Sequence, residues 1–133
     1  MEGFPFVHRE TVRFNDCDAF GHVNNALYLT YLEQARIAFL QRLGFFRRPE
    51  STAEMSMILA RCEIDFRAPA TVGDEIEIGV RPARFGTKSF DLDYELRSGG
   101  RLIAEAKTVL VAFDYAQNRP IELPDDWRRS LAA

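Results

Sequence analysis

Two carboxylates separated by one residue, Asp16 and Asp18, lie in a short polar segment that ends in Asn24 and Asn25. A single carboxylate can attack a reactive carbonyl group as a nucleophile, or it can deprotonate an attacking water. The oxyanion that forms in either reaction needs hydrogen-bond donors, which the unpaired amides at the start of a helix supply. Residues 16–25 are therefore the candidate site for chemistry.

The same polar segment also has simpler interpretations. An aspartate between a strand and a helix is often only a turn former or a cap, because its side chain accepts hydrogen bonds from nearby amides. Taken alone, the residues favour this structural role for both aspartates, and it remains the role expected of Asp16. Asn24 and Asn25 are candidates for the helix N-cap, and their side chains also offer substrate contacts. His22 offers substrate orientation or proton transfer, since the unperturbed pKa of histidine is near neutrality, or merely a backbone hydrogen bond.

A metal site is not expected in this segment. Asp16, Asp18 and His22 are possible ligands, but no other residue completes a matching ligand set. Cys17 and Cys62 are the only cysteines, and their spacing matches neither a zinc site nor a redox motif, so we expect two reduced thiols.

The elements that position this segment follow from hydrophobic periodicity. Residues 7–14 are rich in β formers and predict a first strand. Residues 25–43 carry apolar side chains at three- and four-residue steps, which predicts one long helix that one of the two asparagines caps and Gly44 ends. Alternating patterns predict four more strands, and a short terminal helix is expected from about Pro124; the strands cover residues 60–67, 76–81, 89–96 and 102–113.

This order of elements predicts an α+β fold in which an antiparallel five-stranded sheet wraps around one long central helix. No linker, repeat or low-complexity stretch divides residues 1–133, so we expect a single domain. The helix should bury Leu29, Leu32 and Phe39. One face of the strand over residues 60–67 should be buried as well, with the side chains of Ala60, Cys62, Ile64 and Phe66.

Charge and composition exclude several classes of partner. The net charge is −3, and Lys and Arg are dispersed without forming a basic stripe, so we expect no nucleic-acid partner. No apolar stretch approaches membrane-spanning length, and the N-terminus lacks a basic stretch followed by an apolar run. We therefore expect a cytoplasmic protein without a membrane partner.

The segment from Phe14 to Tyr28, FNDCDAFGHVNNALY, resembles the signature of the 4-hydroxybenzoyl-CoA thioesterase family. The resemblance continues in four further pieces: YLEQAR at residues 31–36, DFRAP at 65–69, VGD at 72–74 and KSF at 88–90. It implies the hot dog fold and an acyl-CoA thioesterase, which hydrolyses a thioester to a free acid and CoA. Because CoA enters as part of the substrate, no separate cofactor is implied.

The resemblance also implies roles for individual residues. The second aspartate of the motif, Asp18, corresponds to the catalytic carboxylate of the family, and the backbone amide of Asn25 corresponds to the donor that polarises the thioester carbonyl. Another branch of hot dog thioesterases uses a glutamate on the long helix, which makes Glu33 the alternative carboxylate. The simpler interpretation of Glu33 is a surface residue paired with a cation such as Arg36.

Substrate contacts are expected from His22, Asn24, Tyr28 and Lys88. The candidates for binding the CoA phosphates are Arg61, Arg84 and Lys88, of which Lys88 is preferred because it belongs to the matching KSF piece. Tyr28 is either a core or interface residue or a wall of the acyl pocket.

The carrier and the assembly are less narrowly defined. The type member of the family has an aromatic residue where this chain has Asn25, and the residues HVNN are more similar to a branch that includes acyl-acyl carrier protein thioesterases. The carrier is therefore either CoA or acyl carrier protein, and an alternative of another class is a module that binds acyl thioesters without cleaving them. The resemblance implies a homodimer or homotetramer with the active site at a subunit interface.

Overall fold

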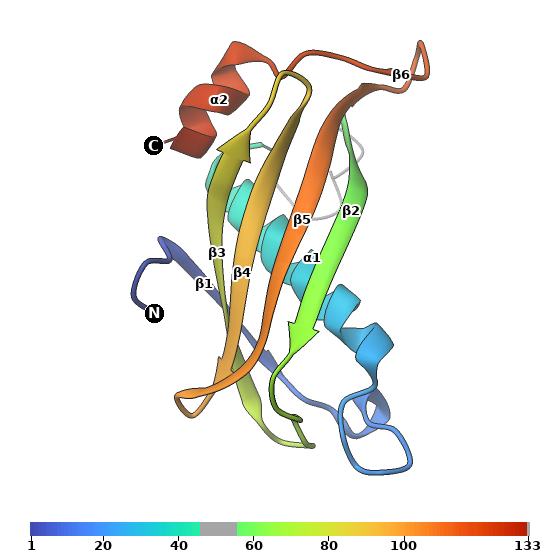
Figure 1. Cartoon of the computed structure of the whole chain (residues 1–133), viewed down its shortest axis with the longest axis vertical. Coiled ribbons are helices and arrows are strands. Elements are labelled where there is room, and N and C mark those ends of the chain that lie inside the picture. The colour runs from blue at the N-terminus through green and yellow to red at the C-terminus, as the bar shows by residue number, and fades with distance from the viewer. Residues whose placement is uncertain (46–55, 133) are drawn as a thin grey trace.

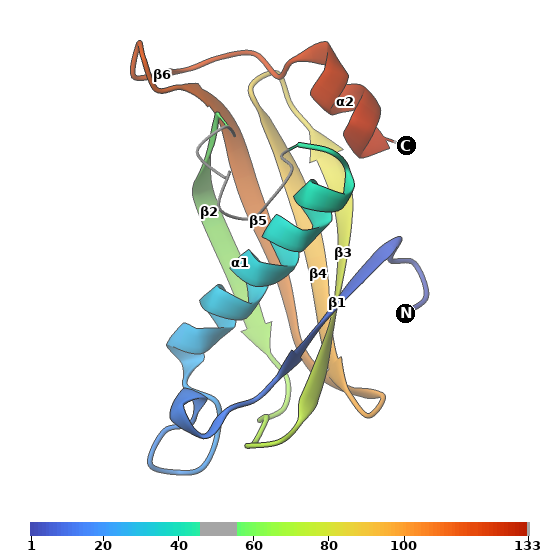
Figure 2. The same cartoon turned by 180° about the vertical axis from the view of Figure 1, so that it is seen from behind.

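The computed structural model of the chain describes residues 1–45 and 56–132. One long helix lies across one face of a curved antiparallel sheet, and a second, short helix lies at one end of that sheet (Figures 1 and 2). The strands follow the spatial order β1-β3-β4-β5-β2, and β6 pairs with β5. The elements are β1 (Phe6–Thr11), η1 (Phe14–Asp16), α1 (Asn25–Arg42), β2 (Met57–Phe66), β3 (Glu75–Phe85), β4 (Ser89–Ser98), β5 (Arg101–Asp114), β6 (Arg119–Pro120) and α2 (Asp125–Ala132).

The long helix α1 begins and ends close to the predicted residues. Asn24 is the N-cap, and its side chain accepts a hydrogen bond from the Ala26 amide at 3.0 Å. At the other end Gly44 has φ 89°, a conformation that glycine adopts without strain after a helix. The face of α1 toward the sheet is buried through Tyr28, Tyr31, Leu32, Ala35, Arg36, Phe39 and Leu40.

The sheet supplies the other half of the core. Ile78 and Val80 of β3 are fully buried, and they pair with Leu96 and Tyr94 of β4, which are buried on the same face. Alternate residues of each strand therefore face α1, as the alternating sequence pattern predicted.

The structure differs from the predicted fold in two ways. Its described part has six strands instead of five, because the two-residue strand β6 is too short to leave a sequence pattern, whereas α2 is the predicted short terminal helix. The first strand ends at Thr11, since residues 14–16 form the turn η1. No helix among the described residues has both the length and the apolar character needed to cross a membrane.

Three predicted core residues are exposed along the β2 edge of the sheet. Leu29 of α1 and Phe66 of β2 are both 49% exposed, although they lie on the expected faces. Ala60 is exposed at a break in the register between Leu59 and Arg61. The prediction that these residues are buried was wrong for a single chain, because β2 is an edge strand with no neighbouring strand on its outer side.

Candidate functional site

The loop between β1 and α1, which contains Asp18, lies at one end of the molecule (Figures 1 and 2). The Asp18 amide donates to the His22 carbonyl oxygen at 2.8 Å, and Gly21, with φ 80°, makes the turn between them. The Asp18 Oδ1 atom accepts hydrogen bonds from the amides of Phe20 at 2.9 Å and His22 at 3.4 Å. Among the described residues no hydrogen bond reaches Oδ2, so this oxygen is available to a substrate.

Asp18 faces an open hollow with a volume of about 320 Å³. His22, Asn25 and Tyr28 line the same hollow, so the fold brings these predicted residues together. The opposite wall comes from the residues that follow β2, with Phe66, Arg67 and Pro69.

The first residue of α1, Asn25, lines this hollow. Asn25 is the first helical residue, and among the described residues its amide makes no hydrogen bond. An unpaired amide at this position carries the positive end of the helix dipole. A carboxylate and a free helix amide from two residues that line one hollow have the chemistry to act on one carbonyl group, one as nucleophile or base and the other as oxyanion donor.

Asn24 has a structural role in the same place. Its side-chain oxygen is used by the Ala26 amide, and its own amide donates to the Asp16 carbonyl oxygen at 2.8 Å. Asn24 does not line the hollow. Of the two roles considered, the structure therefore supports the N-cap, and a substrate contact stays a prediction.

Tyr28 forms an aromatic wall together with a residue that the sequence analysis did not select. Its ring contacts Phe66 edge to face, with centroids 5.2 Å apart, and Tyr31 on the other side, with centroids 6.0 Å apart. Burial raises the pKa of Tyr28 above its ordinary value, so the hydroxyl stays protonated at neutral pH.

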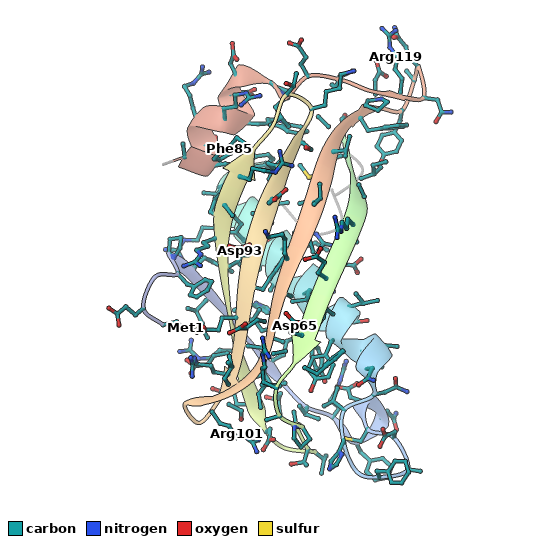
Figure 3. The ribbon with its side chains drawn as sticks, in the orientation of Figure 1. Met1, Asp65, Phe85, Asp93, Arg101 and Arg119 are labelled. Atoms are coloured by element: carbon teal, nitrogen blue, oxygen red, sulfur yellow. The ribbon has the colours of Figure 1, made fainter. Side chains whose placement is uncertain are left out.

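Arg67 is the second wall residue that the sequence analysis missed. Its guanidinium lies 3.3 Å from a Glu105 oxygen and 3.8 Å from an Asp65 oxygen, and Asp65 is seen near the end of β2 in Figure 3. Both Phe66 and Arg67 belong to the DFRAP piece at residues 65–69, so the resemblance contained the signal that could have selected them.

The structure places two predicted residues away from the hollow. Lys88 lies in the turn between β3 and β4, three residues after Phe85, which marks the opposite end of the sheet in Figure 3. Glu33 is exposed on α1 and does not line the hollow. Its predicted pairing with Arg36 was wrong, because Arg36 is buried and donates to the Tyr94 hydroxyl at 3.4 Å.

The candidate ligands for a metal are also separated. Asp16 is buried and accepts a hydrogen bond from the Tyr31 hydroxyl at 2.7 Å, whereas Asp18 faces the hollow. Over residues 1–45 and 56–132, no three His, Cys, Asp or Glu side chains are grouped as metal ligands.

The family follows from a sequence comparison with known proteins. Residues 12–131 match the model of the thioesterase-like superfamily. The chain belongs to this superfamily. It is therefore a thioester hydrolase with the hot dog fold, as the resemblance implied.

Individual relatives agree with this assignment. The chain is 31% identical to a 1,4-dihydroxy-2-naphthoyl-CoA hydrolase of Synechococcus sp. (strain CC9605), an alignment that covers 100% of this chain and 94% of that protein. The crystal structure of a thioesterase from Thermus thermophilus, complexed with coenzyme A and Zn, superposes with a TM-score of 0.88 at 38% identity, over 98% of this chain and 94% of the other. A gentisyl-coenzyme A thioesterase superposes with a TM-score of 0.81 at 26% identity, over 96% of this chain and 100% of the other.

Proposed function

We propose that this chain hydrolyses acyl-CoA thioesters, with Asp18 as nucleophile or general base and the Asn25 amide as oxyanion donor. The observation that carries the proposal is that Asp18 and Asn25, the first residue of α1, line one open hollow. The relatives named as CoA hydrolases, and the related structure that holds coenzyme A, support CoA as the carrier.

Two routes lead to the same products. As a nucleophile, Asp18 adds to the carbonyl carbon, the C–S bond breaks, and water hydrolyses the resulting mixed anhydride. As a general base, Asp18 takes a proton from water while the water oxygen adds to the carbonyl carbon, and the C–S bond then breaks. The leaving thiol has a pKa of about 8.5, as for a free thiol, so it departs without a strong general acid.

The walls of the hollow favour an aromatic acyl group. Phe66, which packs edge to face against the buried ring of Tyr28, presents exposed ring surface in the hollow that Asp18 also lines. Two relatives are named for aromatic acyl groups, naphthoyl and gentisyl. Arg67 lies in the hollow itself, whereas the phosphates of CoA are separated from the thioester by the whole pantetheine arm. Arg67 is therefore positioned for an oxygen substituent of the acyl group or for the pantetheine amides.

A second copy of the chain completes the site in this proposal. The strand β2 has 10 residues and lies at an edge of the sheet. Leu59 of this strand and Leu29 of α1 are both exposed. Such an apolar edge favours pairing with another strand. If two β2 strands pair antiparallel about a twofold axis, the β3–β4 turn of the partner lies at the same end as this copy's Asp18 loop, which is how Lys88 would reach a CoA phosphate.

The test is thiol release from acetyl-, octanoyl-, benzoyl- and hydroxynaphthoyl-CoA by the wild-type chain and by Asp18→Asn and Glu33→Gln. We expect release by the wild type, a loss of about 10²-fold or more in kcat for Asp18→Asn, and little change for Glu33→Gln. Thermal unfolding of each variant checks that the fold is intact. A collapse of activity in Glu33→Gln alone would assign the chemistry to Glu33, and turnover of acyl carrier protein thioesters alone would assign the other carrier.

A further inference from the structure

We propose that Asp16 and Tyr31 are positioning residues. The buried hydrogen bond between them keeps the Asp18 carboxylate at a fixed distance from the Asn25 amide. The inference rests on the proposed function. We call this hydrogen-bonded pair the loop clamp.

Asp16 is the most deeply buried acidic side chain among the described residues, with 4% of its surface exposed. Its Oδ2 atom accepts a hydrogen bond from the Tyr31 hydroxyl at 2.7 Å and one from the Arg13 amide at 3.1 Å. The Arg13 Nε atom lies 3.5 Å from the same oxygen. A charged carboxylate buried this deeply needs such donors to be stable. Arg13 anchors Asp16 to the start of the loop, and Tyr31 anchors it to the second turn of α1.

The backbone of Asp16 extends the same connection to the helix N-terminus. Its carbonyl oxygen accepts the Asn24 amide at 2.8 Å, and Asn24 directly precedes the proposed oxyanion donor, Asn25. In the other direction, Asp18 is only two residues away and is joined to the His22 carbonyl oxygen at 2.8 Å. Asp18 therefore lies two residues from Asp16, and Asn25 directly follows the residue that hydrogen-bonds to the Asp16 carbonyl oxygen. Movement of Asp16 would change the distance between the Asp18 carboxylate and the Asn25 amide.

The charge of Asp16 is part of this arrangement. Burial alone raises the pKa of Asp16, but the hydrogen bond from Tyr31 and the contacts with Arg13 outweigh burial and bring the pKa below its ordinary value. Burial and the same hydrogen bond raise the pKa of Tyr31, so its hydroxyl remains a donor. The groups that face the pair are Arg13 from the loop and, next to Tyr31, the Cys17 thiol. Without the Tyr31 hydroxyl, the Asp16 carboxylate would protonate at a higher pH.

The first test compares Tyr31→Phe with Tyr94→Phe. Tyr94 is a matched control, because its hydroxyl is also buried and bonds Thr108 at 2.7 Å, but it lies between α1 and the sheet, outside the loop. For Tyr31→Phe we expect kcat to fall about ten- to a hundredfold with KM within about twofold, since misplacement of reacting groups affects mainly kcat. Tyr94→Phe should keep kcat even if it lowers the melting temperature. Equal losses of kcat in both variants would overturn the inference.

The second readout is the pH profile of kcat. In Tyr31→Phe the acid limb should move to higher pH, because protonation of Asp16 now releases the loop. Adding Tyr31→Phe to the Asp16→Asn variant should not move the acid limb further. The amide oxygen of asparagine still accepts hydrogen bonds, but the side chain does not titrate. An acid limb that is the same in wild type and Tyr31→Phe would contradict the inference.

Amide hydrogen exchange separates this inference from the proposed function. Tyr31→Phe should accelerate exchange at the Asn24 and Asp18 amides, and Tyr94→Phe should not. If the wild type releases no thiol from any substrate but the exchange result holds, the proposed function fails and the loop clamp remains. If the wild type is active and exchange is the same in Tyr31→Phe, the loop clamp fails alone.

Discussion

The rings of Tyr28 and Phe66 meet edge to face, with centroids 5.2 Å apart and an interplanar angle of 71°. Tyr28 belongs to α1 and Phe66 ends β2, so this contact joins the helix to the edge strand where both border the Asp18 hollow. Tyr28 is 3% exposed and Phe66 is 49% exposed. The ring of Phe66 is therefore exposed to the hollow, and the buried ring of Tyr28 packs against it.

Replacing Phe66 with Ala should reduce selectivity for aromatic acyl groups. An aromatic pair contributes about 0.5–1.5 kcal/mol beyond burial, so we expect kcat/KM for benzoyl-CoA to fall about tenfold while that for acetyl-CoA changes less. Phe85→Ala is the matched control, because Phe85 is a 38% exposed ring at the other end of the sheet. Equal effects of Phe66→Ala on both substrates would argue against an aromatic acyl site.

The oxyanion role of Asn25 can be tested without disturbing the helix. Proline lacks the amide hydrogen but is well tolerated at the first helical position, and Asn24, with ψ 133°, already has the extended backbone that precedes proline. Asn25→Pro should therefore fold normally yet lose about 10²–10³ in kcat, which is the cost of one oxyanion donor. Asn25→Ala keeps the amide and should stay active. A fully active proline variant would exclude this amide as a donor.

The lowered pKa of Asp16 predicts a pH dependence of stability. Because its pKa is lower in the folded than in the unfolded chain, Asp16 stabilises the fold above its unfolded pKa, and this contribution is lost as the pH falls through the folded pKa. The free energy of unfolding, measured by urea denaturation from pH 7 down to about 3, should therefore fall less steeply in Asp16→Asn than in the wild type. Parallel curves would show that Asp16 has similar pKa values in both states.

The exposed edge beside β2 predicts how the chain associates. Leu59 is 45% exposed on this edge, and a charge there should oppose burial against a second copy. Light scattering should show a dimer for the wild type and a shift toward monomer, with reduced activity, for Leu59→Asp. Val72→Asp provides the control, because Val72 is 55% exposed in the connection between β2 and β3 and away from the edge. A wild-type chain that is monomeric and fully active would rule out a shared site.

Local patterns determined much of this protein. Apolar spacing predicted α1 within one residue at its C-terminal end, because a helix that packs on a sheet needs a continuous apolar face and a cap. Alternating patterns predicted the strands of the sheet, because successive side chains of a strand point to opposite faces and only one face packs against α1. The motif around Asp18 predicted a reacting carboxylate close to a helix N-terminus, because residues so near in sequence remain near in space.

Only the tertiary structure decided which residues meet across larger separations. Local patterns alone treat Asp16 and Asp18 alike as turn residues, and only the family resemblance gave them different roles. In the structure, packing against Tyr31 buries Asp16, whereas Asp18 lines the hollow. Phe66 and Arg67 join the site because β2 ends beside the start of α1, and Lys88 lies at the opposite end because the β3–β4 turn does. Which residues lie close together depends on strand order and register. Both arise from the packing of the whole chain and cannot be read from any single segment.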